Sequence, residues 1–209
     1  MKNTIKERYS LVGKRVFVAG HTGMVGSALI RALKSIKCEV LTQDSNELDL
    51  KDSVKVEKWF KDNNPDTVFL AAAKVGGILA NSNYPVNFLY DNLAIQNSVI
   101  SASYKYDVKK FMFLGSSCIY PRNAEQPLKE SSLLTGELEP TNEAYAIAKI
   151  TGIKLCEFYR KQYGVDYISV MPTNLYGPGD NFHPQNSHVV AALISRFYEA
   201  KHLNKDKVV

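Results

Sequence analysis

Short apolar runs alternate with longer amphipathic segments along the chain. The short runs have the length of buried strands, and in the longer segments apolar residues recur every three or four positions, as on one face of a helix. Repeated alternation of strand and helix predicts an α/β fold, a doubly wound and mainly parallel sheet with helices on both faces. The predicted strands are 15–19, 39–42, 67–72, 111–115 and 167–171, and the predicted helices are 24–36, 53–62, 85–104, 143–163 and 189–201.

Charge and hydropathy narrow the function classes. The chain has 26 lysines and arginines against 21 acidic residues, a net charge of +5, scattered along the sequence. The local cluster of Lys105, Lys109 and Lys110 more simply ends a helix and leads into a strand, so we expect no nucleic-acid partner. No apolar run is long enough for a membrane span or a secretory signal, and we expect a cytoplasmic protein without a membrane partner.

The cysteines give no framework of disulfides or metal ligands. Cys38, Cys118 and Cys156 are odd in number, far apart and without C-x-x-C spacing. We therefore expect three free thiols and no metal site.

A glycine-rich motif follows the first predicted strand and opens the first predicted helix. Such a loop permits a tight turn, lets the backbone approach a pyrophosphate and offers the positive end of a helix dipole. It predicts a Rossmann-type dinucleotide site, and the alternative is an ordinary glycine-rich turn. The G-x-x-G-x-x-G spacing resembles that of the extended short-chain dehydrogenase/reductase superfamily. The residues of the motif are Gly20, His21, Thr22, Gly23, Met24, Val25 and Gly26.

That resemblance implies a Y-x-x-x-K pair on a later helix, and the sequence contains two. Tyr106 ends a predicted helix and Lys110 enters a strand, so these two side chains are not held on one helical face. Tyr145 and Lys149 both lie within the predicted helix 143–163, where residues four apart project together. An ammonium beside a phenol favours the phenolate, and we expect Lys149 to lower the pKa of Tyr145 towards working pH.

Hydroxyl side chains follow the fourth predicted strand. Ser116 and Ser117 come directly after Gly115, at the carboxyl edge of a parallel sheet, where ligands bind in open α/β folds. One of the two can hydrogen-bond a reacting carbonyl beside Tyr145, and the alternative is that both merely begin a loop.

Longer motifs sharpen the resemblance. Residues 71–78 (AAAKVGGI), 115–121 (GSSCIYP), 172–178 (PTNLYGP) and 180–189 closely resemble the GDP-L-fucose synthase family, and the resemblance runs from about Lys14 to the last residue. It implies 3,5-epimerisation of GDP-4-keto-6-deoxy-D-mannose, then reduction of the C4 ketone with NADPH. It also implies a homodimer. A related nucleotide-sugar 4-epimerase or dehydratase, and a cofactor-binding fragment without turnover, remain alternatives.

The resemblance also implies roles for individual residues. Ser116, Tyr145 and Lys149 correspond to its catalytic triad, with Ser117 left open as the serine. Cys118 corresponds to the base and His188 to the acid of epimerisation, because inverting a centre beside a ketone needs groups on both ring faces. Arg196 corresponds to a residue that binds the substrate diphosphate. Beyond the glycine motif, the implied cofactor contacts are Leu114, Gly115, Lys149, Pro172, Thr173, Asn174, Leu175 and His188.

Two features depart from the family pattern. The family's arginines for an adenosine 2′-phosphate correspond to about Thr22 and the stretch 42–44, where Asp44 suits a free 2′-hydroxyl, so NAD is left open beside NADP. The family also continues beyond this length. We therefore expect an N-terminal extension at 1–13, a dinucleotide-binding domain with the catalytic residues at 14–180, and the start of an incomplete substrate lobe at 181–209.

Overall fold

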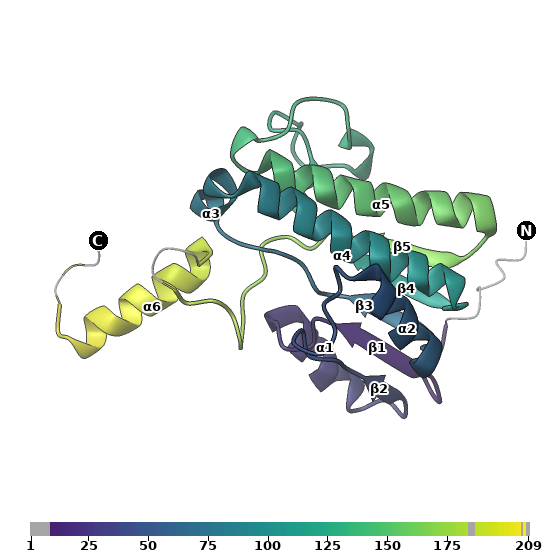
Figure 1. Ribbon diagram of the computed structural model, residues 1–209. Coiled ribbons are helices and arrows are strands. Elements are labelled where there is room, and N and C mark those ends of the chain that lie inside the picture. The colour runs from purple at the N-terminus through teal and green to yellow at the C-terminus, as the bar shows by residue number, and fades with distance from the viewer. Residues whose placement is uncertain (1–8, 184–186, 206, 208–209) are drawn as a thin grey trace, which may run out of the picture.

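The computed structural model describes residues 9–183, 187–205 and 207. Five strands form one parallel sheet in the order β2-β1-β3-β4-β5 (Figure 1). This confirms the predicted α/β class. The strands are β1 Arg15–Ala19, β2 Glu39–Leu41, β3 Thr67–Leu70, β4 Lys110–Leu114 and β5 Asp166–Val170.

The predicted helices are present, with ends that shift by at most a few residues. One further helix, α3, was not predicted. The helices are α1 Met24–Leu33, α2 Ser53–Asn63, α3 Ile78–Asn83, α4 Pro85–Lys105, α5 Glu143–Tyr163 and α6 Val189–His202, with short 3-10 turns at η1 Ser117–Ile119, η2 Glu130–Ser132 and η3 Pro140–Asn142.

Helices cover the two faces of the sheet unequally. In β1, Val16 and Val18 pack with Leu33 of α1 on one face, while Phe17 packs on the other face. There the core includes Phe60 of α2 together with side chains of α4 and α5. Alternate side chains of a strand point to opposite faces, so the apolar run of β1 feeds both cores.

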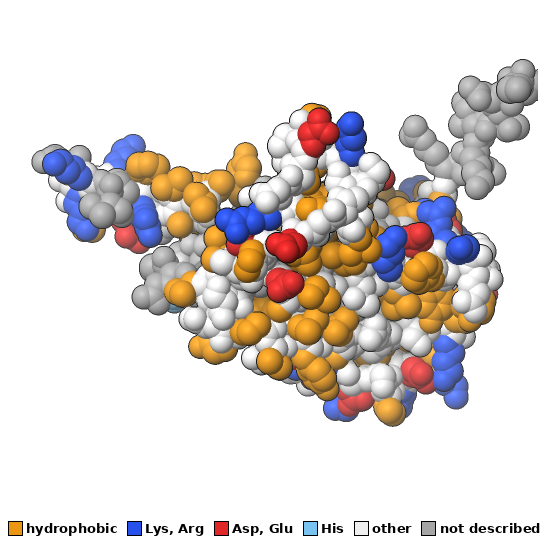
Figure 2. All heavy atoms as spheres, turned by 90° about the horizontal axis from the view of Figure 1, so that it is seen from above, with side chains coloured by type: hydrophobic (Ala, Val, Ile, Leu, Met, Phe, Trp, Pro, Cys, Tyr) orange, Lys and Arg blue, Asp and Glu red, His pale blue; other side chains and the backbone are white. Residues whose placement is uncertain are grey.

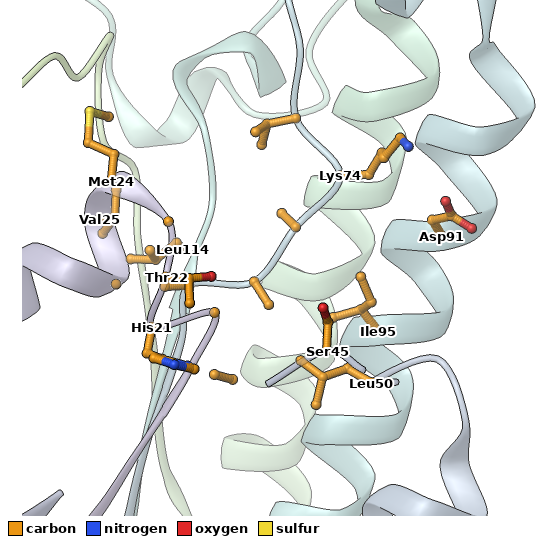
Figure 3. A pocket seen from close by; sticks show the side chains of 18 of the residues that line it. His21, Thr22, Met24, Val25, Ser45, Leu50, Lys74, Asp91, Ile95 and Leu114 are labelled. Atoms are coloured by element: carbon orange, nitrogen blue, oxygen red, sulfur yellow. The ribbon is translucent and has the colours of Figure 1, made fainter. Parts of the chain in front are cut away.

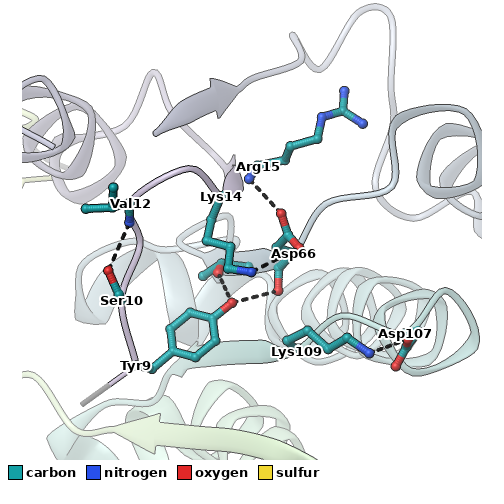
Figure 4. Close-up of polar contacts among 9 residues, drawn as sticks. Tyr9, Ser10, Val12, Lys14, Arg15, Asp66, Asp107 and Lys109 are labelled. Atoms are coloured by element: carbon teal, nitrogen blue, oxygen red, sulfur yellow. Dashed lines mark hydrogen bonds and ion pairs between the residues drawn. The ribbon is translucent and has the colours of Figure 1, made fainter. Parts of the chain in front are cut away.

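The amino-terminal edge of the sheet is tied together around Asp66 (Figure 4). Asp66 Oδ2 accepts a 2.8 Å hydrogen bond from the Arg15 backbone N–H. The Tyr9 hydroxyl lies 3.0 Å from Thr67 Oγ1 and donates to the Asp66 carbonyl at 3.5 Å. These contacts hold the beginnings of β1 and β3 together, at the edge of the sheet opposite to the carboxyl ends of the strands.

The C-terminal helix projects from the sheet (Figure 1). Several apolar side chains of α6 are exposed, including Val189, Phe197 and Tyr198. The predicted division of the chain at residues 13 and 180 stays a prediction, and residues 1–8, 184–186, 206 and 208–209 lie outside the described residues. Within the described residues, no helix is both long and apolar enough to cross a membrane.

Candidate active site

A cleft of about 1150 Å³ runs along the carboxyl edge of the sheet. Its walls come from the segments that follow β1, β2, β3, β4 and β5, as expected for an open parallel sheet. Figure 3 shows His21 and Thr22 on the loop after β1, with Ser45 and Leu50 across from them. All of the sequence-predicted cofactor residues line this cleft: Gly20, His21, Thr22, Gly23, Met24, Val25, Gly26, Leu114, Gly115, Lys149, Pro172, Thr173, Asn174, Leu175 and His188.

The glycine loop has the shape that a pyrophosphate needs. Gly20 has φ +87°, and a Cβ on Gly26 would lie 2.0 Å from the Gly20 carbonyl oxygen, so the loop closes tightly onto α1. At Gly23, by contrast, the nearest atom to an added Cβ is 3.5 Å away. Gly23 is also the N-cap of α1, and it has no side chain that could accept hydrogen bonds from the first-turn N–H groups. The loop therefore fits a dinucleotide pyrophosphate at a helix N-terminus.

The predicted catalytic pair lies on one turn of α5. Lys149 is only 4% exposed, and its ammonium donates a 2.8 Å hydrogen bond to the Leu114 carbonyl at the end of β4. Its Nζ lies 5.6 Å from the centroid of the Tyr145 ring. Tyr145 in turn makes an edge contact with Phe88 of α4, with ring centroids 6.4 Å apart. Strand end and helix thus hold both side chains at the same wall of the cleft.

The electrostatics of this pair correct one expectation. Burial lowers the pKa of Lys149 to about 8. The pKa of Tyr145 is raised, mainly by burial and then by the nearby Cys118 thiolate charge, although the Ser116 hydroxyl lowers it. The expected depression of the Tyr145 pKa is therefore wrong for this site without ligands, because desolvation of the phenolate outweighs its polar neighbours. Tyr145 is a protonated phenol here, the form that a proton donor needs.

Ser116 and Cys118 form a second polar pair. The Cys118 thiol donates to Ser116 Oγ at 3.1 Å. Burial raises the pKa of the thiol, while Ser116 and the Lys149 charge act in the opposite direction. Ser116 lines the cleft, whereas Ser117 begins η1 and, like Cys118, is not among the described lining residues. The geometry thus favours Ser116 over Ser117, which the sequence left open.

The remaining predicted residues differ in whether they line the cleft. His188 lines the cleft as the N-cap of α6. Arg196 lies two turns further along the same helix and is exposed, outside the described lining of the cleft. Tyr106 follows α4, and Lys110 starts β4 at the far edge of the sheet, where its Nζ pairs with Asp166 at 2.7 Å. Tyr106 and Lys110 are outside the described lining of the cleft, whereas Tyr145 and Lys149 line it. The catalytic role of Tyr145 and Lys149 stays a prediction.

Two asparagines that the sequence analysis missed shape the wall after β3. Asn92 of α4, 3% exposed, accepts from the Lys74 N–H at 2.9 Å and donates to the Lys74 carbonyl at 3.0 Å. Asn81 of α3 donates to the Gly76 and Gly77 carbonyls, and its Oδ1 is buried without a hydrogen-bond partner among the described residues. Both residues bond backbone groups of the segment after β3, and a polar residue in a helical segment does not by itself indicate such a contact.

The described part of the chain holds no group of three or more His, Cys, Asp or Glu side chains that could bind a metal ion. The cleft instead combines a pyrophosphate loop with a serine, a tyrosine and a lysine. Residues 16–209 match the NAD dependent epimerase/dehydratase family. The chain belongs to this family.

GDP-L-fucose synthases of other organisms are similar to most of this chain. It is 59% identical to a GDP-L-fucose synthase of Sinorhizobium fredii and 58% identical to one of Escherichia coli, over 92% and 94% of its length. It spans 62% and 61% of those two proteins, or about three fifths of the relatives.

Solved structures agree in fold. A GDP-L-fucose synthetase of Naegleria fowleri bound to NADP has a TM-score of 0.86 and 33% identity, covering 96% of this chain and 67% of that one. A GDP-D-glycero-L-gluco-heptose synthase from Campylobacter jejuni, solved in the presence of NADPH, has a TM-score of 0.88 and 41% identity. That match covers 91% of this chain and 56% of the other.

Proposed function

We propose that this chain supplies the dinucleotide site and the acid–base groups of an enzyme that converts GDP-4-keto-6-deoxy-D-mannose to GDP-L-fucose. The observation that carries the proposal is one cleft lined by the glycine loop, Ser116, Tyr145 and Lys149. The GDP-L-fucose synthases that are 57–59% identical support the choice of sugar. Because the chain spans about three fifths of such relatives, turnover by the 209 residues alone is part of what the experiments test.

For the reductive step, a bound nicotinamide dinucleotide supplies hydride to C4. Tyr145 then donates its phenolic proton to the C4 oxygen, and the Ser116 hydroxyl hydrogen-bonds the same oxygen. Lys149, held by the Leu114 carbonyl, places positive charge over the Tyr145 ring, 5.6 Å from its centroid. That charge stabilises the Tyr145 phenolate as it forms, although the phenol is protonated beforehand.

For the epimerisation step, the proposal assigns proton removal to Cys118 and proton return to His188. The Cys118 thiol donates a hydrogen bond to Ser116, and Ser116 lines the cleft. His188 lines the cleft from the segment before α6. Protons beside the C4 ketone are acidic enough for a thiolate to remove them, and inversion needs return of a proton from the other face.

The test separates the two half-reactions. Deuterium uptake at C3 and C5 of the keto sugar is followed in heavy water without cofactor, and cofactor oxidation is followed separately. Cys118→Ser should lower the exchange rate by about a hundredfold, because a hydroxyl is a far weaker base than a thiol at neutral pH. Tyr145→Phe should retain exchange and lower cofactor oxidation by a similar factor of about a hundred.

Both variants should bind the dinucleotide as the unsubstituted chain does, which separates chemistry from folding. If the 209-residue chain lacks turnover, the two variants are compared in a fusion of this chain with the region of a GDP-L-fucose synthase that it does not align with. Exchange at the unsubstituted rate in Cys118→Ser would exclude the thiol as base. Equal loss of both activities in both variants would contradict the division of roles.

We propose in addition that α4 and α5 form a homodimer contact. Both helices expose large apolar side chains, and Figure 2 looks onto this side of the molecule, where hydrophobic side chains gather. Phe158→Glu should give a monomer by light scattering, with Val54→Glu at a still more exposed apolar position on α2 as the control. A monomeric mass for the unsubstituted chain would contradict the proposal. The exposed residues are Val86, Tyr90, Tyr104, Ile147, Phe158 and Tyr163.

A further inference from the structure

The outer end of the cleft, beyond the glycine loop, carries a carboxylate at its rim. Asp44 follows β2 by three residues, and its Oδ1 lies 3.5 Å from Nε2 of His21, the residue directly after Gly20. The Asp44 side chain is 66% exposed, and both residues line the cleft. The carboxylate is thus held beside the glycine loop and open to a ligand.

The charges around Asp44 are predominantly negative. Asp49 and Asp91 also line the cleft, and Lys51 lies between them, with Nζ 3.9 Å and 3.7 Å from their carboxylate oxygens. No arginine lines the cleft within the described residues. Lys51 and His21 are both directed at carboxylates. Lys74 also lines the cleft, on the side of Asp91 and away from His21 (Figure 3).

Asp44 is the charged side chain that its own loop offers to the cleft, because the loop residues Gln43, Ser45 and Asn46, which also line the cleft, are neutral. Gln43 accepts a 3.3 Å hydrogen bond from Trp59 Nε1 and donates to Glu47, so both ends of its amide already have a protein partner. Thr22 is exposed and uncharged. No group at this end is placed to neutralise a further anion.

We infer that this end of the cleft selects a dinucleotide with a free adenosine 2′-hydroxyl, NADH, over the 2′-phosphorylated NADPH, and that Asp44 makes the selection. The inference rests on the proposed dinucleotide site. In doubly wound folds an acidic residue about twenty positions beyond the glycine motif accepts hydrogen bonds from the adenosine ribose. Asp44 stands 18 positions after Gly26, at that place. A 2′-phosphate would bring a charge of about −1.5 to −2 against a carboxylate whose one basic contact among the described residues is His21.

The preference departs from two of the similar structures, which were solved with NADP or NADPH. Tight phosphate binding requires charged donors that outweigh the cost of dehydrating the phosphate. This rim offers a carboxylate and the neutral donors of Thr22, Ser45 and Asn46, and no arginine among the described residues. The selection is therefore local to the loops after β1 and β2, and it is independent of the sugar end of the cleft.

Two ligands that lack nicotinamide test the inference by calorimetry on the 209-residue chain. ADP-ribose and its 2′-phosphorylated analogue differ only at the position in question, and NADH and NADPH serve as the complete pair. ADP-ribose and NADH should bind at least about tenfold more tightly than their phosphorylated forms at low salt. That ratio should shrink as ionic strength rises, because screening weakens repulsion between exposed charges.

A charge-removing variant assigns the effect to Asp44. Asp44→Asn should tighten binding of the 2′-phosphorylated ligands by about tenfold and weaken ADP-ribose only a few-fold, so the ratio approaches one. Glu47→Gln is the matched control. It removes one carboxylate from the same loop, at a residue outside the described lining of the cleft, and should leave the ratio within about twofold of the unsubstituted chain.

The outcomes separate the inference from the proposal beneath it. Equal or tighter binding of the phosphorylated ligands overturns the inference and leaves the dinucleotide site intact. A preference for ADP-ribose that survives Asp44→Asn overturns the assignment to Asp44. Failure of the folded chain to bind any of the four ligands overturns both the inference and the proposed function.

Discussion

One end of the cleft is shaped by backbone atoms, and the other end is shaped by side chains. Around the glycine loop, backbone atoms make the contacts that shape the site. These contacts are possible only because Gly20 and Gly26 have no side chain. At the catalytic end the site consists of side chains, and one of them, Lys149, is an amine buried to 4% exposure. The first end thus depends on close packing, while the second retains a group that opposes folding.

The largest effect is expected at the tightest point of the backbone-built end. Gly26→Ala places a methyl group 2.0 Å from the Gly20 oxygen, and the loop must move to accept it. We expect the free energy of unfolding to fall by about 3 kcal/mol and dinucleotide binding to disappear. Urea denaturation and calorimetry measure the two effects, and a variant with unchanged stability would contradict the close packing described for Gly26.

Gly23→Val separates binding from folding at the same end. Its Cβ meets no protein atom within 3.5 Å, and the backbone is extended there with φ −71° and ψ 168°, so the folded chain accommodates it. The side chain would occupy the approach of the pyrophosphate. Affinity for ADP-ribose should fall by about a hundredfold, or about 2.7 kcal/mol, with unfolding unchanged within about 1 kcal/mol. Retained affinity would remove the basis for placing the pyrophosphate over this loop.

Lys149→Met tests the opposite relation at the catalytic end. The pKa of the amine is about 8 when folded and about 10.4 when unfolded, so below pH 8 the folded state holds a buried charge at a cost. That cost disappears as the folded amine loses its proton between about pH 8 and 10. Met should therefore stabilise the chain by about 2 kcal/mol at pH 7, after losing the bond to the Leu114 carbonyl.

The pH dependence is the control for that variant. The stability advantage of Lys149→Met over the unsubstituted chain should shrink steadily from pH 8 to pH 10. Chemical denaturation at several pH values measures it. A difference that is independent of pH would show that packing, and not the charge of the amine, separates the two proteins.

The smallest effect is expected at the second Y-x-x-x-K copy. Tyr106→Phe should change stability by less than about 0.5 kcal/mol and leave cofactor oxidation unchanged, because Tyr106 lies outside the described lining of the cleft. It is the matched control for Tyr145→Phe, removing one phenol from a Y-x-x-x-K pair on the far side of the sheet. Loss of cofactor oxidation in Tyr106→Phe would contradict the assignment of the catalytic tyrosine to Tyr145 alone.

Periodicity was sufficient for the strands and the long helices because each buries a continuous apolar face. It missed α3, whose sequence ILANSN has no sustained apolar period and which packs against η3. The glycine loop and the choice of Tyr145 followed from spacing alone. The raised pKa of Tyr145 did not, because it depends on the burial that Phe88 and the sheet provide. Asn92 was missed because a clamp on Lys74, 18 residues away, leaves no local signal.

The clamp of Asn92 on Lys74 has a consequence for timescales. It pairs both backbone groups of Lys74 as a neighbouring strand would, within a segment after β3 that has no regular structure. The Lys74 amide should then exchange with solvent as slowly as amides of α4, while amides on either side exchange quickly. This wall of the cleft is consequently ordered before any ligand arrives, and an incoming molecule bears little entropic cost for shaping it.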